Sequence, residues 1–307
     1  MALQNSGPIK ISEIANEFDS LAGNTPDSLS EFYGAADGVP GSGAIDISDF
    51  YGTSSVIAYT ASNATDVNLQ TVFGSDWAAN IAKSYTVPSG VELGATQVSN
   101  NALTAPAGMG GTLVITNSGT LSGAGGSGGS GGNNSSIYSS PSGSAGQAGG
   151  DALEILTNGV SVVNNGTIRA GGGGGGGGGE GQDAYRTAHS WINNEGGAGG
   201  NGGRGQGYNH GRQGGSGGGN GTHQWYNIMR NGHGGSGGGG GHYGNSGSGG
   251  SGGNNTHVDF TDIEQSDHIS RYGPGSGGGG AAAGFSIKKG SGISVAQSGS
   301  GSQAGRT

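Results

Sequence analysis

The chain has 307 residues, of which 78 are glycine, and carries 20 acidic and 11 basic side chains, a formal net charge of −9 at pH 7. The absence of cysteine excludes disulfides, zinc–thiolate sites and thiol nucleophiles, and an acidic chain without a basic stripe argues against nucleic-acid binding through phosphates. No apolar stretch approaches the ~20 residues of a membrane span, the start lacks a signal-peptide pattern, and the irregular spacing of glycine with few prolines excludes collagen.

Residues 1–55 contain a short repeat. The segment 29–34 (LSEFYG) recurs eighteen residues later as 47–52 (ISDFYG), and a looser copy begins at Ile11. Each copy places a serine before an acidic residue, a pattern typical of a helix N-terminus. We expect three very short helices, too small for a stable domain alone, whose aromatic pairs pack against a partner; an arm folded back onto its own body is the alternative. The expected docking residues are Ile11, Ile14, Phe18, Phe32, Tyr33, Phe50 and Tyr51.

Residues 56–121 predict a small β module. The runs 56–60, 85–87 and 112–116 are β-branched or aromatic and are bounded by glycine, proline and asparagine. Trp77 lies in a segment with the pattern of one or two helical turns. We expect its ring to be a core aromatic rather than a binding residue.

A second repeat leads into the glycine runs. Residues 113–121 (LVITNSGTL) and 160–168 (VSVVNNGTI), 47 residues apart, share an apolar strand, an Asn-x-Gly-Thr turn and one apolar residue before glycine. A weaker third copy is expected over 285–293. Because pure Gly/Ser linkers need no apolar lead-in, the repeat argues against a flexible linker.

The glycine-rich part, residues 122–307, includes nine consecutive glycines at 171–179. Of the 78 glycines, 66 follow residue 110, and ordering them costs on the order of 100 kcal/mol in backbone entropy. Extended threefold helices point every N–H and C=O outward, so helices without side chains can bond to one another in all directions. We therefore predict a mainly β and irregular fold: a stacked polyglycine-type (PPII-like) helix sandwich over 122–307, the small β module, and the short-helix N-terminal docking arm. A disordered glycine-rich matrix is the alternative.

Five segments of different composition interrupt the glycine runs: 180–195, 204–213, 220–233, 242–243 and 254–274. They hold every histidine and two of the three tryptophans, amid small polar residues and arginine, as recognition surfaces do. Local minicores that hold the loops together are the alternative use of these aromatics. The expected receptor contacts are Tyr185, Arg186, His189, Trp191, Tyr208, His210, Arg212, His223, Trp225, Tyr226, Arg230, Tyr243, Phe260, His268, Arg271 and Tyr272.

Other chemistry has little support in the sequence. No phosphate-binding loop or nucleophile elbow is present, and no histidine pair has the helical i, i+4 spacing of a zinc protease. The acids Asp259, Asp262, Glu264 and Asp267 form no evident pair of the kind that hydrolyses glycosides. We expect no enzymatic activity, no cofactor and no metal.

The segment 162–168 (VVNNGTI) before the long glycine run, with aromatic loops interrupting further runs, resembles the glycine-rich adhesins at tail-fibre tips of T-even-like phages. The resemblance covers about residues 112–307 and implies stacked polyglycine helices with variable distal loops that bind outer-membrane proteins or surface glycans of the host. The N-terminal repeat is similar to short segments at the start of marine-phage virion proteins, which implies a docking arm. Residues 1–110 do not match the fibre-docking domain of the T-even adhesins.

These features predict a non-enzymatic phage tail or tail-fibre protein, part of the virion and made in the host cytoplasm. Residues 1–55 would bind other tail or fibre proteins, and the loops a host surface protein or glycan. Several copies, as a homo-oligomer such as a trimer or as multiple copies per virion, would add weak contacts into tight binding. Neither nucleic acid nor membrane insertion is expected. The alternatives are a purely structural virion protein, whose glycine block packs against neighbouring subunits, and a polysaccharide-degrading enzyme.

Overall fold

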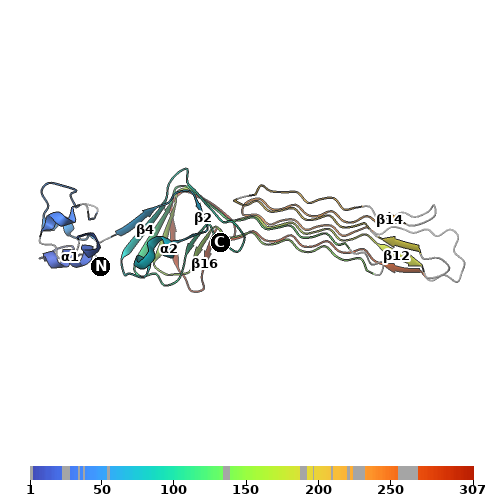
Figure 1. The fold of residues 1–307 in the computed structure, drawn as a ribbon, viewed down its shortest axis with the longest axis horizontal. Helices are drawn as coiled ribbons and strands as arrows, with labels where there is room; N and C mark the ends of the chain where they lie inside the picture. The colour runs from blue at the N-terminus through green and yellow to red at the C-terminus, as the bar shows by residue number, and fades with distance from the viewer. Residues whose placement is uncertain are drawn as a thin grey trace.

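Short parallel strands form the middle of the molecule, between helical turns at the N-terminal end and a bundle of long extended segments (Figure 1). The three parts follow one another along a single long axis. The computed structural model describes the chain except for residues 1–2, 23–27, 34, 37–38, 54–55, 134–138, 187–191, 196, 209, 220–221, 224–231 and 255–268.

The N-terminal repeat forms three short helices, as the sequence predicts. Acidic side chains cap two of them: the Lys10 N–H donates to the Glu13 carboxylate at 2.8 Å, and the Asp46 N–H donates to Asp49 at 2.8 Å. Each cap satisfies a backbone donor at a helix start. The helices are α1 (Ile11–Ala22), η1 (Leu29–Phe32) and η2 (Ile47–Phe50).

The phenylalanines of this N-terminal unit make a core of their own. Ile14, Phe18, Phe32 and Phe50 are fully buried, and the centroids of the three phenylalanine rings lie 6.0–6.3 Å apart. The expectation that these four side chains pack against a partner is therefore wrong. The unit needs them for itself, because a segment this small has few other apolar side chains to bury.

The remaining docking candidates lie nearer the surface. Tyr33 and Tyr51 are 36% and 37% exposed, and their hydroxyls donate to the carbonyls of Gly43 and Gly7. Ile11 is half-buried.

The β module is a three-sided coil of parallel strands. Each turn of the chain adds one strand to a first sheet, one to a second and one to a third, and the turns stack by parallel pairing. The first sheet contains β1 (Val56–Thr60), β4 (Ala82–Val87), β7 (Thr112–Asn117), β10 (Val160–Asn164) and β17 (Val295–Ser298). The second contains β2 (Ala64–Thr65), β5 (Glu92–Gly94), β8 (Thr120–Ser122), β11 (Thr167–Arg169) and β18 (Ser302–Ala304). The third contains β3 (Val67–Asn68), β6 (Leu103–Ala105), β9 (Leu153–Ile155) and β16 (Ile287–Lys289).

The coil extends beyond the segment 56–121 to which the sequence analysis confined it. Its last turns come from residues 153–169 and 287–304. The third copy of the strand–turn repeat is β17 with β18, rather than the expected 285–293. Glycine-rich segments separate these turns in the chain, which hides their equivalence from a local pattern search.

Apolar side chains from successive turns stack inside the coil, where each turn buries the one before it. Trp77 is 1% exposed and packs with Phe73 at 6.1 Å between ring centroids, so its predicted core role is confirmed. These rings belong to α2 (Leu69–Phe73) and η3 (Gly74–Trp77), and α2 contacts β3 and β6. The stacked core residues include Leu93, Leu121 and Ile168 in the second sheet and Leu103, Leu153 and Ile287 in the third.

The Asn-x-Gly-Thr turn is a stacking device. The buried Asn117 amide donates to Oδ1 of Asn164 at 2.8 Å, and the Asn164 amide donates to the Ser302 carbonyl at 3.1 Å. The third position of the motif must be glycine because successive turns lie in close contact. A Cβ on Gly166 would lie 2.1 Å from the Gly119 carbonyl oxygen. The motif therefore fixes the register of successive turns.

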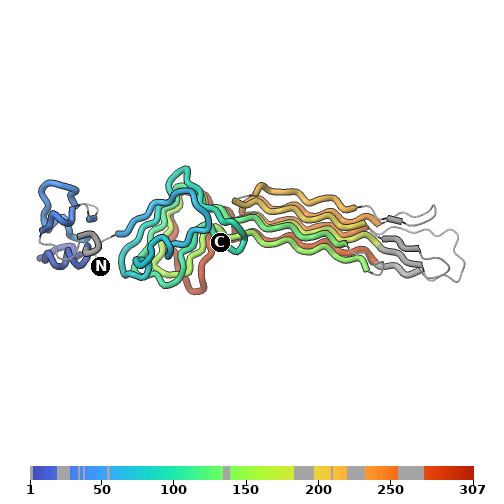
Figure 2. Tube along the Cα trace, in the orientation of Figure 1, coloured from blue at the N-terminus to red at the C-terminus, as the bar shows by residue number. Residues whose placement is uncertain are grey.

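Both glycine-rich insertions leave the coil at the same corner, between the second and third sheets. The first runs from β8 to β9 and the second from β11 to β16. The corresponding corner of the second turn is the short loop 95–102. Figure 2 shows the inserted segments running side by side away from the β module.

The nine glycines 171–179 lie at the centre of this glycine block, bonded to six neighbouring segments with a period of three residues. Each N–H donates and each C=O accepts, at 2.7–3.1 Å. The N–H groups donate in rotation to segments 144–150, 200–206 and 245–251. The carbonyls accept in rotation from segments 126–132, 235–241 and 278–284.

This network leaves no space for side chains along the central segment. A Cβ on Gly171, Gly174 or Gly177 would lie 1.8–1.9 Å from a carbonyl oxygen of the first insertion. Residues 170–181 are all buried. The outer segments carry serine, alanine, asparagine and arginine at positions that face outward, such as Ser127 and Ser130, three residues apart.

Candidate functional site

The segments that interrupt the glycine runs lie at both ends of the block (Figure 2). The described residues of segments 180–195, 220–233 and 254–274 lie at the end far from the β module, whereas 204–213 and 242–243 are turns beside it (Figure 1). An arrangement in which the loops are presented together at one end therefore holds for the first three segments and not for the other two. Glycine runs do not encode direction, so the sequence alone cannot distinguish these two groups.

A small antiparallel sheet spans the far end. Its strands come from three separate loops, so Tyr185, Arg186, His223, Arg271 and Tyr272 share one backbone framework. The strand order is β14 (Thr222–His223), β13 (Ile192–Glu195), β12 (Asp183–Arg186) and β15 (Ile269–Tyr272). Seven further candidates lie outside the described residues: His189, Trp191, Trp225, Tyr226, Arg230, Phe260 and His268.

Glu180 lies at the base of this far-end group. It follows directly on the nine glycines and is 1% exposed. Its N–H donates to the Pro141 carbonyl at 3.1 Å, and its carbonyl accepts from the Gly275 N–H at 2.9 Å. The far-end loops thus leave the block from a backbone that is hydrogen-bonded on both sides.

The near-end aromatics hold the glycine block against the β module. The Tyr208 ring lies so close to Gly94 that a Cβ there would fall 2.1 Å from a ring carbon. The Arg169 guanidinium lies 4.0 Å from the centroid of the Tyr243 ring and pairs with Glu92 at 3.1 Å. Burial raises the pKa of the Tyr243 hydroxyl, which Arg169 partly opposes. The minicore alternative therefore describes Tyr208 and Tyr243.

Two polar candidates share this near end. Arg212 donates from Nε to the Gly240 carbonyl at 2.7 Å, and its Nη1 lies 3.1 Å from His242 Nε2. His210 is exposed.

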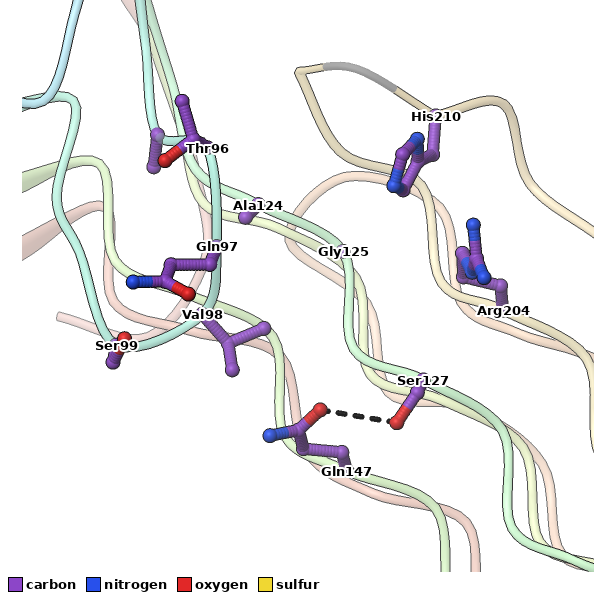
Figure 3. A pocket seen from close by; sticks show the side chains of 11 residues that line it. Thr96, Gln97, Val98, Ser99, Ala124, Gly125, Ser127, Gln147, Arg204 and His210 are labelled. Carbon is purple, nitrogen blue, oxygen red and sulfur yellow. Dashed lines mark hydrogen bonds between the residues drawn. The ribbon is translucent and has the colours of Figure 1, made fainter.

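An open cleft lies at the junction between the β module and the glycine block (Figure 3), with a volume of about 370 Å³. One wall is the corner loop of the second turn, residues 95–99, and the others come from both insertions. Its polar side chains are those of Thr96, Gln97, Ser99, Ser127, Gln147, Arg204 and His210. His210 was a candidate from the sequence. The others were missed, because single polar residues on distant segments carry no local signal of a shared site.

A further far-end segment, the turn of the first insertion, was not expected from the sequence. On one flank, the Gly132 N–H donates to Gly178 at 2.8 Å; on the other flank, Pro141 accepts from Glu180. Both flanks therefore lie at the end that carries the far-end sheet. The residues Ile137 and Tyr138 within this turn were the available signal, although residues 134–138 lie outside the described part.

The described residues contain no group of three His, Cys, Asp or Glu side chains that could hold a metal ion. Among them no helix is both long and apolar enough to cross a membrane.

Comparison with known proteins gives one family and one solved structure. A family model described as phage tail fibre adhesin Gp38 matches residues 54–305. The crystal structure of the gp37–gp38 adhesin tip complex of the bacteriophage S16 long tail fibre is similar over 97% of this chain and 99% of that chain, at 18% identity and a TM-score of 0.38. No curated protein matches.

Proposed function

This chain belongs to the family of phage tail fibre adhesins described as Gp38, and from this premise we propose that the loops at the far end of its glycine block bind a receptor on the host-cell surface. The observation that carries the proposal is the position of these loops. Three chain segments with aromatic, histidine and arginine side chains converge on one small sheet at the end of a glycine block whose central segment, 171–179, is buried and hydrogen-bonded at every residue. Recognition loops on a rigid framework lose little entropy on binding.

We propose that the scaffold consists of polyglycine-type threefold helices. The three-residue rotation of donors and acceptors along 171–179 supports this assignment, because a helix with three residues per turn points successive groups toward different neighbours. A block bonded in six directions resists bending, which suits a spacer that holds binding loops away from a fibre.

We further propose that residues 1–55 attach the chain to other tail-fibre proteins. Three copies of one motif converge on a single aromatic core, so one chain presents three related surfaces. Ile47 and Tyr51 are each 37% exposed and Tyr33 is 36% exposed. These side chains, rather than the buried phenylalanines, are the candidates for contact.

Binding of the full chain to host cells, in competition with phage adsorption, tests the receptor-binding proposal. Trp191→Ala and Trp225→Ala, in two far-end segments, are expected to lower cell binding at least about tenfold, as loss of a hot-spot aromatic does. Tyr59→Ala removes a ring of the β module that is 39% exposed and packs edge-to-face on Phe73; with an unchanged unfolding curve it is the matched control. Saturable binding that blocks adsorption and is unchanged in both tryptophan variants would contradict the far-end assignment. A folded chain that binds no susceptible cell would favour the purely structural role.

A further inference from the structure

The junction cleft is a preformed site that the far-end loops do not use. Its volume of about 370 Å³ is at the lower end of the range of small-ligand sites, roughly 300–1,000 Å³. Figure 3 shows the side chains of Gln97 and Gln147, and those of Arg204 and His210, around one hollow. Such a volume suits a small molecule rather than a long polymer.

Hydrogen bonds fix the walls of the cleft. The Ala95 N–H donates to Ser122 at 2.9 Å, and the Thr96 N–H donates to Asp66 Oδ1 at 2.9 Å. On the opposite side, the Tyr208 N–H donates to the Gly123 carbonyl at 3.1 Å. Because these walls are part of the β coil and of the block, a ligand would meet a site that needs little ordering.

The cleft carries positive charge on a net acidic chain. None of the residues that line it is acidic, and Arg204 and His210 supply its ionisable side chains. The guanidinium of Arg204 is exposed and has no hydrogen bond or ion pair within the described part of the chain. The adjacent Asp66 carboxylate already accepts the Thr96 N–H and hydroxyl. An unpaired arginine in a cleft favours a carboxylate or another oxyanion.

The other polar side chains of the cleft offer both hydrogen-bond donors and hydrogen-bond acceptors. Ser127 donates to Gln147 Oε1 at 3.0 Å, which leaves the Gln147 amide N–H groups for a ligand. The Gln97 amide donates to Asn100 at 3.2 Å, which leaves the Gln97 oxygen as an acceptor. Sugar hydroxyls both donate and accept, so they match such a lining. Ala95, Val98 and Ala124 supply the apolar side chains of the lining.

We propose that the junction cleft binds a small acidic saccharide, with its carboxylate on Arg204 and its ring hydroxyls on Gln97, Gln147 and Ser127. This second site is separate from the far-end loops and does not depend on the receptor-binding proposal. A fibre adhesin with such a site can hold acidic surface sugars along its side while its far end engages a receptor.

Titration of the full chain with glucuronic acid, followed by calorimetry or NMR, tests this site without cells. Glucuronic acid is expected to bind more tightly than glucose or inorganic phosphate. Arg204→Gln is expected to weaken binding about tenfold or more, and Gln147→Ala several-fold. Lys289→Gln removes one exposed charge outside the cleft and is expected to leave binding unchanged.

Four results would overturn the proposal: no binding of glucuronic acid, equal binding of glucose, equal binding of inorganic phosphate, or unchanged binding in Arg204→Gln. Because Arg204 faces outward from the block, its replacement leaves the backbone network intact, and an unchanged unfolding curve verifies this. Loss of cell binding in far-end variants with normal glucuronic acid binding would separate this site from the proposed receptor contacts.

Discussion

A single methyl group decides whether a position in the glycine block is permitted. At the centre of the block, the space that a Cβ would need is occupied by a neighbour's carbonyl oxygen. On the outer segment 211–219, some glycines face open solvent. The composition of the block thus reflects two different demands, close backbone contact inside and few restrictions outside.

Gly175→Ala and Gly214→Ala form a matched pair that tests this distinction. A Cβ on Gly175 would lie 2.0 Å from the Gly238 oxygen, whereas a Cβ on Gly214 meets nothing within 4 Å. We expect Gly175→Ala to lower the free energy of unfolding by about 3 kcal/mol or more, since a close-packed backbone cannot shift to make room. Gly214→Ala is expected to change it little or raise it by up to about 1 kcal/mol. Equal effects in chemical denaturation would contradict the buried-network description.

Lys83 is an ammonium group enclosed in carbonyls. It is 1% exposed, and its Nζ donates to Ala79 at 2.8 Å, Ile81 at 3.1 Å and Gly110 at 2.8 Å. Lys83→Met is expected to cost about 3 kcal/mol, because buried acceptors lose their donor. Lys289→Met, at an exposed position, should change the stability by less than about 0.5 kcal/mol. Thermal unfolding of the two variants measures the difference.

Lys288 predicts a dependence of stability on alkaline pH. Its ammonium lies 2.9 Å from Glu154 and 3.3 Å from Asp151, and the hydrogen bond to Glu154 is the main cause that raises its pKa above 10.5. The folded state therefore holds this proton more tightly, so the contribution is complete below pH 10.5 and is lost as the pH rises through the folded pKa. Its side chain is 44% exposed, so solvent screening limits the effect to about 1 kcal/mol or less. In denaturation curves across that range, Lys288→Met should lack this loss.

At the scale of elements, the fold is a coil in which the same corner carries a long insertion in two of the turns. The stacked strands are two to six residues long, so no strand is stable alone and each depends on the turn beneath it. The glycine segments extend from one corner because that is where both insertions begin and return. Backbone pairing, rather than side-chain packing, then continues the structure outward.

Hydrogen exchange should reveal this pairing directly. Every amide of 171–179 is buried and bonded to a carbonyl, so these glycines are expected to exchange about as slowly as the core strands of the coil. The amides of Gly214 and Gly217 have no partner among the described residues and are expected to exchange fast. Rapid exchange throughout 171–179 would instead favour a disordered glycine-rich chain.

The sequence predicted those elements whose signal is local. The Asn-x-Gly-Thr turn marked two successive turns of the coil, and Trp77 was recognisable as a core ring. The strand Ile287–Lys289 was expected in the third copy of the strand–turn repeat and instead belongs to the third sheet. Its partner Leu153–Ile155 lies far away in the chain, and three residues carry no periodicity that would indicate this pairing. The functions of Tyr208 and Tyr243 were also out of reach, since identical aromatic–glycine compositions occur at both ends of the block. Phe32 and Phe50 were expected to contact a partner but are buried, because an aromatic repeat is equally suited to an internal core.

As a whole, the molecule separates its functions along its length. The N-terminal unit, the coil and the far-end loops follow one another on a long axis, and two hydrophobic clusters, one in the N-terminal unit and one in the coil, are separate. Neither cluster includes a residue from the extended glycine segments. The coil should therefore fold without the block.

Replacement of residues 124–151 and 171–285 by short corner loops like 95–102 tests this independence. We expect the shortened chain to retain a β-type circular dichroism spectrum and a cooperative unfolding transition, because the stacked core is preserved. It should bind neither host cells nor glucuronic acid, since both sites require the insertions. A shortened chain that does not fold would show that the block is part of the coil's stability.

The threefold rotation of hydrogen bonds also limits how such a gene can change in length. Loss or gain of one codon within 171–179 would shift every later donor toward the wrong neighbour and turn outward serines of adjoining segments inward. Tolerated changes in the scaffold should come as multiples of three codons matched between neighbouring segments, whereas the far-end loops can vary freely in length. Natural variants of this adhesin are thus expected to diversify by insertion and deletion at the tips, while the glycine segments stay constant in phase.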